Sequence, residues 1–152
     1  MATQNKNLSF FNKAEIPSAK GMRIGIVVSN WNSEITNNLL AGTKATLLEC
    51  GASEQHITVM EVPGSFELVF GAKLLSKQEL DVIICLGSVI QGETKHFDFV
   101  CEGTTNGIMQ VSLKYNKPVI FGVLTDNTMQ QAIDRSGGKH GNKGIECAIA
   151  CI

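Results

Sequence analysis

The sequence predicts an α/β fold, a three-layer α/β/α sandwich built around a four-stranded parallel sheet. Two observations lead to this prediction. Short apolar runs alternate with longer stretches in which apolar residues recur at helical spacing. The first run, residues 23–29, is also apolar enough to be buried on both faces of a sheet. A chain of 152 residues suits one hydrophobic core, and we expect an N-terminal arm over residues 1–22 and one domain over residues 23–152.

The first strand and helix follow the arm. Residues 23–29 form an apolar run, and residues 30–33 (Asn-Trp-Asn-Ser) provide a turn and a helix cap. Apolar side chains then recur at helical spacing over residues 34–50, and Gly51 is a typical end for such a helix.

The same pattern is repeated twice in the middle of the chain. Residues 56–62 are the second expected strand, followed by a Pro63-Gly64 turn and a helix over residues 65–75. Residues 81–86 are the third strand, and the next helix runs from His96 to about residue 116. Because a helix joins each strand to the next, the strands are expected to be parallel and covered on both faces.

The last strand and two helices complete the sandwich. Residues 118–124 are the fourth strand, a turn occupies residues 125–127, and a helix spans residues 128–134. The glycine-rich residues 137–144 break the pattern before a final helix over residues 145–152.

Charge and cysteine content exclude several classes of partner. The net charge is −1 and Lys and Arg form no run, so neither nucleic acid nor an anionic membrane is an expected partner. The five cysteines form no C-x-x-C pair and lie mostly in apolar runs, as reduced thiols of a cytoplasmic protein do. The first 13 residues are polar and no apolar stretch could span a bilayer, so we expect neither a signal peptide nor a membrane segment.

Topology alone predicts where a ligand binds. In an open parallel sheet the ligand site lies beyond the carboxyl ends of the strands. Four segments meet there, namely residues 30–31, 63–67, 88–96 and 125–126. They carry an aromatic ring, a carboxylate, backbone donors at helix starts and one imidazole, which suits a polar aromatic ligand with an anionic group.

The segment that begins at Gly87 partly matches one phosphate-binding pattern and lacks another. Gly87-x-x-x-x-Gly92-Glu93-Thr94 has the outline of a P-loop, but Glu93 stands where that loop needs a lysine. No strand is followed by the G-x-G-x-x-G pattern of a dinucleotide site. The amides of residues 92–94, at a helix N-terminus, are expected to hold one phosphate, with Arg135 as the partner cation.

Each candidate also has a purely structural interpretation. Trp31 fits a lid on the core, and His96 fits a capping or surface residue. Glu67 would stabilise the first turn of a helix in any case. Arg135 fits a helix-terminal charge, and Lys143 a solvated loop residue.

Five segments together resemble the 6,7-dimethyl-8-ribityllumazine synthase family. They are Arg23-Ile-Gly-Ile-Val-Val, Val62-Pro-Gly-Ser-Phe-Glu67, Val89-Ile-Gln-Gly-Glu-Thr-Lys-His-Phe-Asp98, Phe121-Gly-Val-Leu-Thr125 and Asp134-Arg-Ser-Gly-Gly-Lys-His-Gly-Asn-Lys-Gly144. Their order and spacing match that family from about residue 23 to residue 150. The resemblance implies a flavodoxin-like fold and the condensation of 5-amino-6-ribitylaminouracil with 3,4-dihydroxy-2-butanone 4-phosphate in riboflavin biosynthesis. It implies no metal and no cofactor.

The resemblance also assigns roles to individual residues. His96 would transfer protons, while Arg135 and the backbone amides of Glu93 and Thr94 would bind the phosphate. The pyrimidine and its ribityl chain would be held by Trp31, Ser65, Phe66, Glu67, Ser88, Val89, Ile90, Phe121 and Lys143. Many family members have Arg where this chain has Gln91, which implies a weaker affinity for the phosphate.

Assembly is likewise implied by the resemblance alone. The family forms pentamers with active sites between subunits, and some members build shells of sixty subunits from twelve pentamers. Association with riboflavin synthase is another implied partnership, and the N-terminal arm could add a strand to a neighbour's sheet. Two rival interpretations remain: a non-catalytic lumazine- or flavin-binding shell or carrier protein, and a phosphoryl-binding module of flavodoxin type.

Overall fold

A four-stranded parallel sheet forms the centre of the molecule. The computed structural model describes residue 7 and residues 9–152. The strands are β1 (Ile24–Ser29), β2 (Ile57–Val62), β3 (Val82–Ile90) and β4 (Val119–Asp126), in the spatial order β2-β1-β3-β4. In this register Ile24 of β1 lies opposite Ile57 and Val82.

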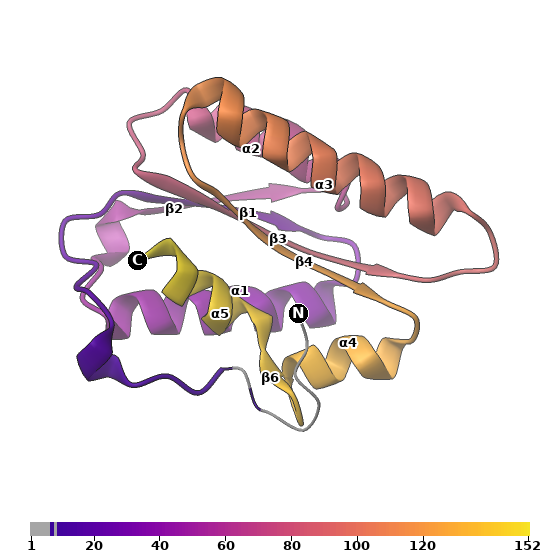
Figure 1. The fold of residues 1–152 in the computed structure, drawn as a ribbon, viewed down its shortest axis with the longest axis horizontal. Helices are drawn as coiled ribbons and strands as arrows, with labels where there is room; N and C mark the ends of the chain where they lie inside the picture. The colour runs from indigo at the N-terminus through magenta and orange to yellow at the C-terminus, as the bar shows by residue number, and fades with distance from the viewer. Residues whose placement is uncertain (1–6, 8) are drawn as a thin grey trace.

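Helices cover both faces of this sheet (Figure 1). One face carries α1 (Ser33–Glu49), α4 (Met129–Arg135) and α5 (Lys143–Cys151). The opposite face carries α2 (Leu68–Ser76) and α3 (His96–Tyr115). The predicted three-layer α/β/α fold with a four-stranded parallel sheet is therefore confirmed.

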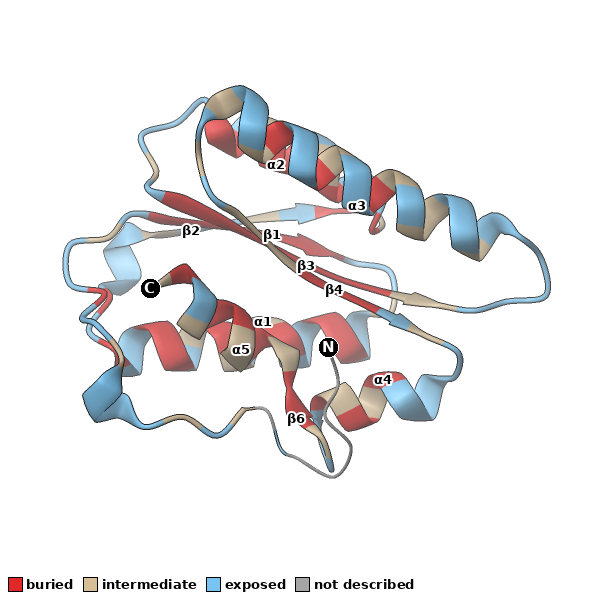
Figure 2. Ribbon diagram, viewed as in Figure 1, coloured by how far each residue is buried: buried red, intermediate tan, exposed pale blue. Residues whose placement is uncertain are grey.

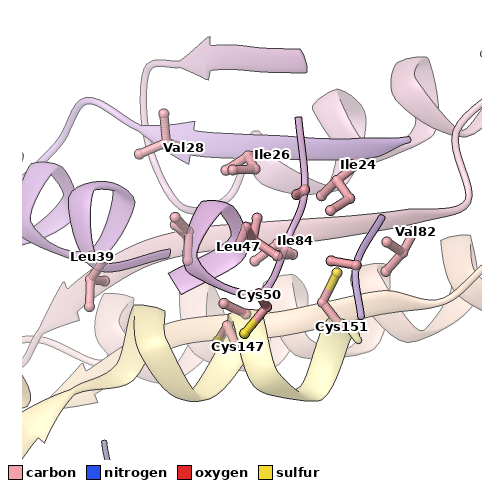
Figure 3. Packing of buried hydrophobic residues seen from close by; sticks show 14 of the residues in the cluster. Ile24, Ile26, Val28, Leu39, Leu47, Cys50, Val82, Ile84, Cys147 and Cys151 are labelled. Carbon is pink, nitrogen blue, oxygen red and sulfur yellow. The ribbon is translucent and has the colours of Figure 1, made fainter. Parts of the chain in front are cut away.

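The hydrophobic core is divided by the sheet into two halves. Successive residues of a strand point to opposite faces, so Ile26 packs toward α1 and α5 while Val27 packs toward α2 and α3. Figure 3 shows the first half, where Ile24, Ile26 and Ile84 face the helices. All six residues of β1 are buried, as Figure 2 shows along the middle of the sheet. This two-sided burial explains why no polar side chain occurs in β1 before Ser29.

Two element boundaries differ most from the predicted ones, while β4 runs on to Asp126 through part of the predicted turn and α5 begins at Lys143 instead of residue 145. The third strand continues to Ile90 instead of ending at Leu86, because Gly87–Ile90 stay in register with residues 123–126 of β4. The second helix begins at Leu68 rather than Ser65. The Ser65 carbonyl accepts hydrogen bonds from the Leu68 amide (3.3 Å) and the Thr104 hydroxyl (3.2 Å), which fixes a turn before the helix.

The predicted glycine-rich break is a small antiparallel hairpin of β5 (Ser136–Gly138) and β6 (Gly141–Asn142). Gly137 and Gly141 have φ angles of 125° and 86°, which favour glycine. The Asn142 side chain accepts from the Gly144 amide at 2.8 Å and donates to the Asn38 carbonyl at 2.8 Å. The hairpin thereby ties the start of α5 to α1.

The described part of the arm packs on its own chain. Short 3-10 turns occur at Lys13–Glu15 and Glu54–His56. Ala19 is fully buried, and its amide donates to the Cys50 carbonyl at 2.9 Å. Residues 1–6 and 8 of the predicted arm lie outside the described residues, and pairing of the arm with a neighbour's sheet stays a prediction. No helix in the described ranges is both long and apolar enough to cross a membrane.

Candidate active site

A cavity of about 540 Å³ opens where the strand order of the sheet reverses. The chain passes from β1 to β2 on one side and later to β3 and β4 on the other, which leaves a crevice beyond the carboxyl ends of β1 and β3. The cavity is lined by Trp31, Gly64, Ser65, Phe66, Glu67, Ser88, Val89, Ile90, Gly92, Thr94, His96, Phe97, Phe99 and Val100. Three of the four segments expected to converge here do so, whereas residues 125–126 are not part of the lining.

Trp31 is held at the edge of the cavity by the turn after β1. Its amide donates to the Pro63 carbonyl at 3.0 Å. Asn32 adopts a left-handed conformation (φ 58°), and its side-chain amide donates to the Ser88 carbonyl at 3.1 Å. Trp31 is 71% exposed, so its interpretation as a lid on the core is wrong. An exposed indole at a cavity is available to stack on a flat ligand.

Two serine hydroxyls lie buried in the cavity wall. Ser65 is 5% exposed and Ser88 is 1% exposed, and neither hydroxyl has a hydrogen-bond partner within residues 7 and 9–152. Gly87 permits this packing, because a Cβ there would lie 2.7 Å from the Ser65 Oγ. A buried hydroxyl without a partner costs about 1–3 kcal/mol, so a polar ligand or water is expected to satisfy both groups.

His96 is the first residue of α3 and lines the cavity. Its amide donates weakly to the Thr94 hydroxyl at 3.4 Å, which keeps the preceding loop against the helix N-terminus. Gly92 and Thr94 also line the cavity, whereas Glu93 contributes no lining atom. The N-terminus of this 20-residue helix therefore presents its positive end to the same space as the imidazole.

The remaining three predicted residues lie outside this cavity. Arg135, at the end of α4, donates from Nη1 to the His140 carbonyl at 2.9 Å, and its Nη2 lies 2.6 Å from Glu146 Oε1. Lys143, at the start of α5, has its Nζ 3.1 Å from Glu146 Oε2. Phe121 lies in β4 and lines a second cavity of about 460 Å³. A single chain therefore brings His96 together with the pyrimidine-site residues of the turn after β1, the end of β3 and the turn before α2, but not with Phe121, Arg135 or Lys143.

Sequence reasoning missed part of the cavity wall. Phe97, Phe99 and Val100 of α3 line it beside His96. Phe97 and Val100 are apolar positions of a predicted helix, and such positions are normally assigned to the core. Val100 lies four residues after His96 and therefore on the same face of the helix, which is the signal that could have identified it. Helical spacing gives no such signal for Phe97 or Phe99.

Burial shifts the pKa of several groups outside the cavity. It raises the pKa of the Asp126 carboxyl, an effect that the nearby Arg135 charge opposes. It also raises the pKa of the Cys85 thiol to about 12 and that of Cys147 to about 11. Thiols protonated at neutral pH are poor nucleophiles, so these two cysteines act as core residues. In the described ranges, no three His, Cys, Asp or Glu side chains lie close enough to hold a metal ion.

Comparisons with known proteins agree over the whole chain. A family profile described as 6,7-dimethyl-8-ribityllumazine synthase matches residues 21–152. A protein of that name from Flavobacterium johnsoniae is 59% identical, over 100% of this chain and 80% of the relative. Relatives with the same name from Christiangramia forsetii and Porphyromonas gingivalis are 53% and 48% identical, over 100% of this chain and 92% and 95% of their own lengths.

Proposed function

This chain belongs to the 6,7-dimethyl-8-ribityllumazine synthase family, and we propose that it condenses 5-amino-6-ribitylaminouracil with 3,4-dihydroxy-2-butanone 4-phosphate, with release of phosphate and water. The observation that carries the proposal is the cavity that joins an exposed indole, two unsatisfied hydroxyls and an imidazole at a helix N-terminus. An aromatic ring with a polyhydroxyl chain matches the first two features, and a phosphorylated ketone matches the last.

The pyrimidine substrate would occupy the part of the cavity between β1 and β3. Trp31 would stack on the ring, while residues 88–90 at the end of β3 would hold its edge. Ser65, Phe66 and Glu67 would contact the ribityl chain. The unpartnered Ser65 and Ser88 hydroxyls support this placement, since a polyol and a polar ring both offer hydrogen-bond partners.

The phosphate substrate would bind at the N-terminus of α3. The amides of Glu93 and Thr94 precede the helix, and its positive end favours an anion. His96 would then lie between the two substrates and move protons to and from the reacting atoms. An imidazole can both accept and release a proton near neutral pH.

The reaction requires the protein to position the two substrates and to transfer protons. The 5-amino group of the pyrimidine attacks the ketone and forms an imine with loss of one water. Phosphate is then eliminated, and the enol that remains becomes a ketone. The ribitylamino nitrogen attacks this carbonyl and closes the ring with loss of a second water. General acid–base catalysis contributes about 10²–10⁴-fold, whereas holding two reactants together contributes about 7–11 kcal/mol. Simultaneous binding of both substrates is therefore the larger effect.

Phe121, Arg135 and Lys143 would reach the cavity from a neighbouring copy. Their place outside the cavity of their own chain supports this arrangement. A contact between two different surfaces of identical chains closes into a ring when the rotation allows it. Such a ring would also cover the exposed apolar side chains on α2 and α3, among them Phe70, Met109 and Leu113.

We expect the purified protein to be a pentamer or a shell of twelve pentamers, and light scattering measures the mass of the particle. The calculated mass of one chain is 16.4 kDa, so the two assemblies differ twelvefold. A monomer at micromolar concentration would contradict the shared site.

Three further statements stay predictions. They are the division into an arm (1–22) and a domain (23–152), a cytoplasmic location, and association with riboflavin synthase.

The function is tested by ligand titration followed by a product assay. Because the chain has a single tryptophan, a lumazine that stacks on Trp31 should quench its fluorescence to saturation. Adding both substrates should then produce 6,7-dimethyl-8-ribityllumazine, and the matched control Trp31→Phe should keep this activity without the quenching signal. Saturable quenching without product would favour the carrier protein, and no quenching would refute the stacking role.

A further inference from the structure

Glu146 joins two cations that lie outside the cavity. It stands in the first turn of α5, with Oε1 2.6 Å from Arg135 Nη2 and Oε2 3.1 Å from Lys143 Nζ. The side chains of Glu146 and Arg135 are only 18% and 17% exposed, so solvent screens this pair less than an ordinary surface pair. One carboxylate thus connects the end of α4 with the start of α5.

These ion pairs orient the two cations without occupying all their donors. Within the described residues, Arg135 donates one hydrogen bond to Glu146 and one to the His140 carbonyl. A guanidinium has five N–H donors, and an ammonium group such as that of Lys143 has three. Lys143 donates one bond, to Glu146. Most donors therefore have no partner in the described residues while the side chains are already held by Glu146, which lowers the entropy cost of binding a ligand.

The surroundings indicate what would happen without the Glu146 carboxylate. Arg135 and Lys143 approach the same carboxyl group, so they would repel each other once its charge was removed. Asp126 offers an alternative partner, since it lies close enough to Arg135 to feel its charge and has one buried oxygen without a hydrogen bond in the described part of the chain. A released guanidinium would turn toward that oxygen.

We infer that Glu146 is a positioning residue that holds Arg135 and Lys143 at a fixed separation for substrate binding. The inference rests on the proposed function, in which Arg135 contacts the phosphate of one substrate and Lys143 lies near the other. Glu146 itself touches neither substrate. It sets where the phosphate-binding donors stand before either substrate arrives.

The test measures phosphate affinity in Glu146→Gln, which keeps the size of the side chain and removes its charge. We expect the dissociation constant for inorganic phosphate, measured by calorimetry on the assembled protein, and KM for the butanone phosphate to rise about tenfold. In an Arg135→Ala background the same substitution should change either value less than twofold, because its effect passes through Arg135. Glu146→Asp should restore part of the affinity.

A surface ion pair provides the matched control. Glu54 lies 2.6 Å from Lys44 at an exposed position, and Glu54→Gln should leave phosphate binding unchanged. Tighter or unchanged phosphate binding in Glu146→Gln would overturn the inference, as would an equal loss in the Arg135→Ala background. If Glu146→Gln does not fold, Glu146→Asp provides the test. Its carboxylate is one methylene shorter and cannot hold both cations in the same place, so an unchanged phosphate affinity in Glu146→Asp would also overturn the inference. If the wild-type protein binds phosphate but forms no lumazine, the proposed function is refuted. The inference about Glu146 is then still decided by the phosphate affinities of the variants.

Discussion

Replacing His96 with alanine is expected to lower kcat by about 10²–10⁴-fold and to leave measurable activity. His96 is the first residue of α3 and lines the cavity in which both substrates are proposed to bind. The loss is limited because the two substrates would still be held together, and that positioning supplies the larger part of the rate. Steady-state kinetics with both substrates measures the effect.

The matched control is His56→Ala. His56 is an exposed residue of the 3-10 turn before β2 and is not among the residues that line the cavity, so the control should keep full activity. An unchanged kcat in His96→Ala would exclude the imidazole from catalysis. A large rise in KM with kcat preserved would make His96 a binding residue instead.

Replacing Arg135 with alanine is expected to raise KM for the butanone phosphate about 10- to 100-fold. The substitution removes a charge-assisted hydrogen bond, which contributes about 1.5–3 kcal/mol, and tenfold corresponds to about 1.4 kcal/mol. KM for the pyrimidine should change little. Arg23→Ala is the control, because Arg23 pairs with Glu79 at an exposed edge. A loss confined to pyrimidine binding would contradict the role of Arg135.

The two variants together test whether the site is shared between chains. A site that takes His96 from one copy and Arg135 from its neighbour can be rebuilt by mixing variants in one ring. With equal co-expression of His96→Ala and Arg135→Ala, about one quarter of the sites would regain both side chains. Activity at low phosphate-substrate concentration should then exceed that of either variant alone. No recovery would mean that one chain supplies both residues.

The sequence was sufficient to predict the fold because the burial of a strand or helix determines which of its own residues are apolar. Ile24, Ile26 and Val27 are all apolar since β1 is covered on both faces, and this pattern predicts a parallel sheet. The boundaries at Ile90 and Leu68 were missed for a different reason. They depend on the β3–β4 ladder and on the Thr104 contact with Ser65, and both partners are distant in the sequence.

By itself, the sequence determined the order of strands and helices, the cavity residues near Trp31, Ser65 and His96, and the family resemblance. Only the tertiary structure decided that Arg135 and Lys143 lie outside this cavity and share the carboxylate of Glu146. The physical reason is that hydrophobic periodicity reports which side of an element faces the core. The distance between two side chains on different helices is set by the packing of all the layers between them. The exposed Trp31 shows the same division, because a lone aromatic residue has no periodicity to reveal whether it faces the core or a ligand.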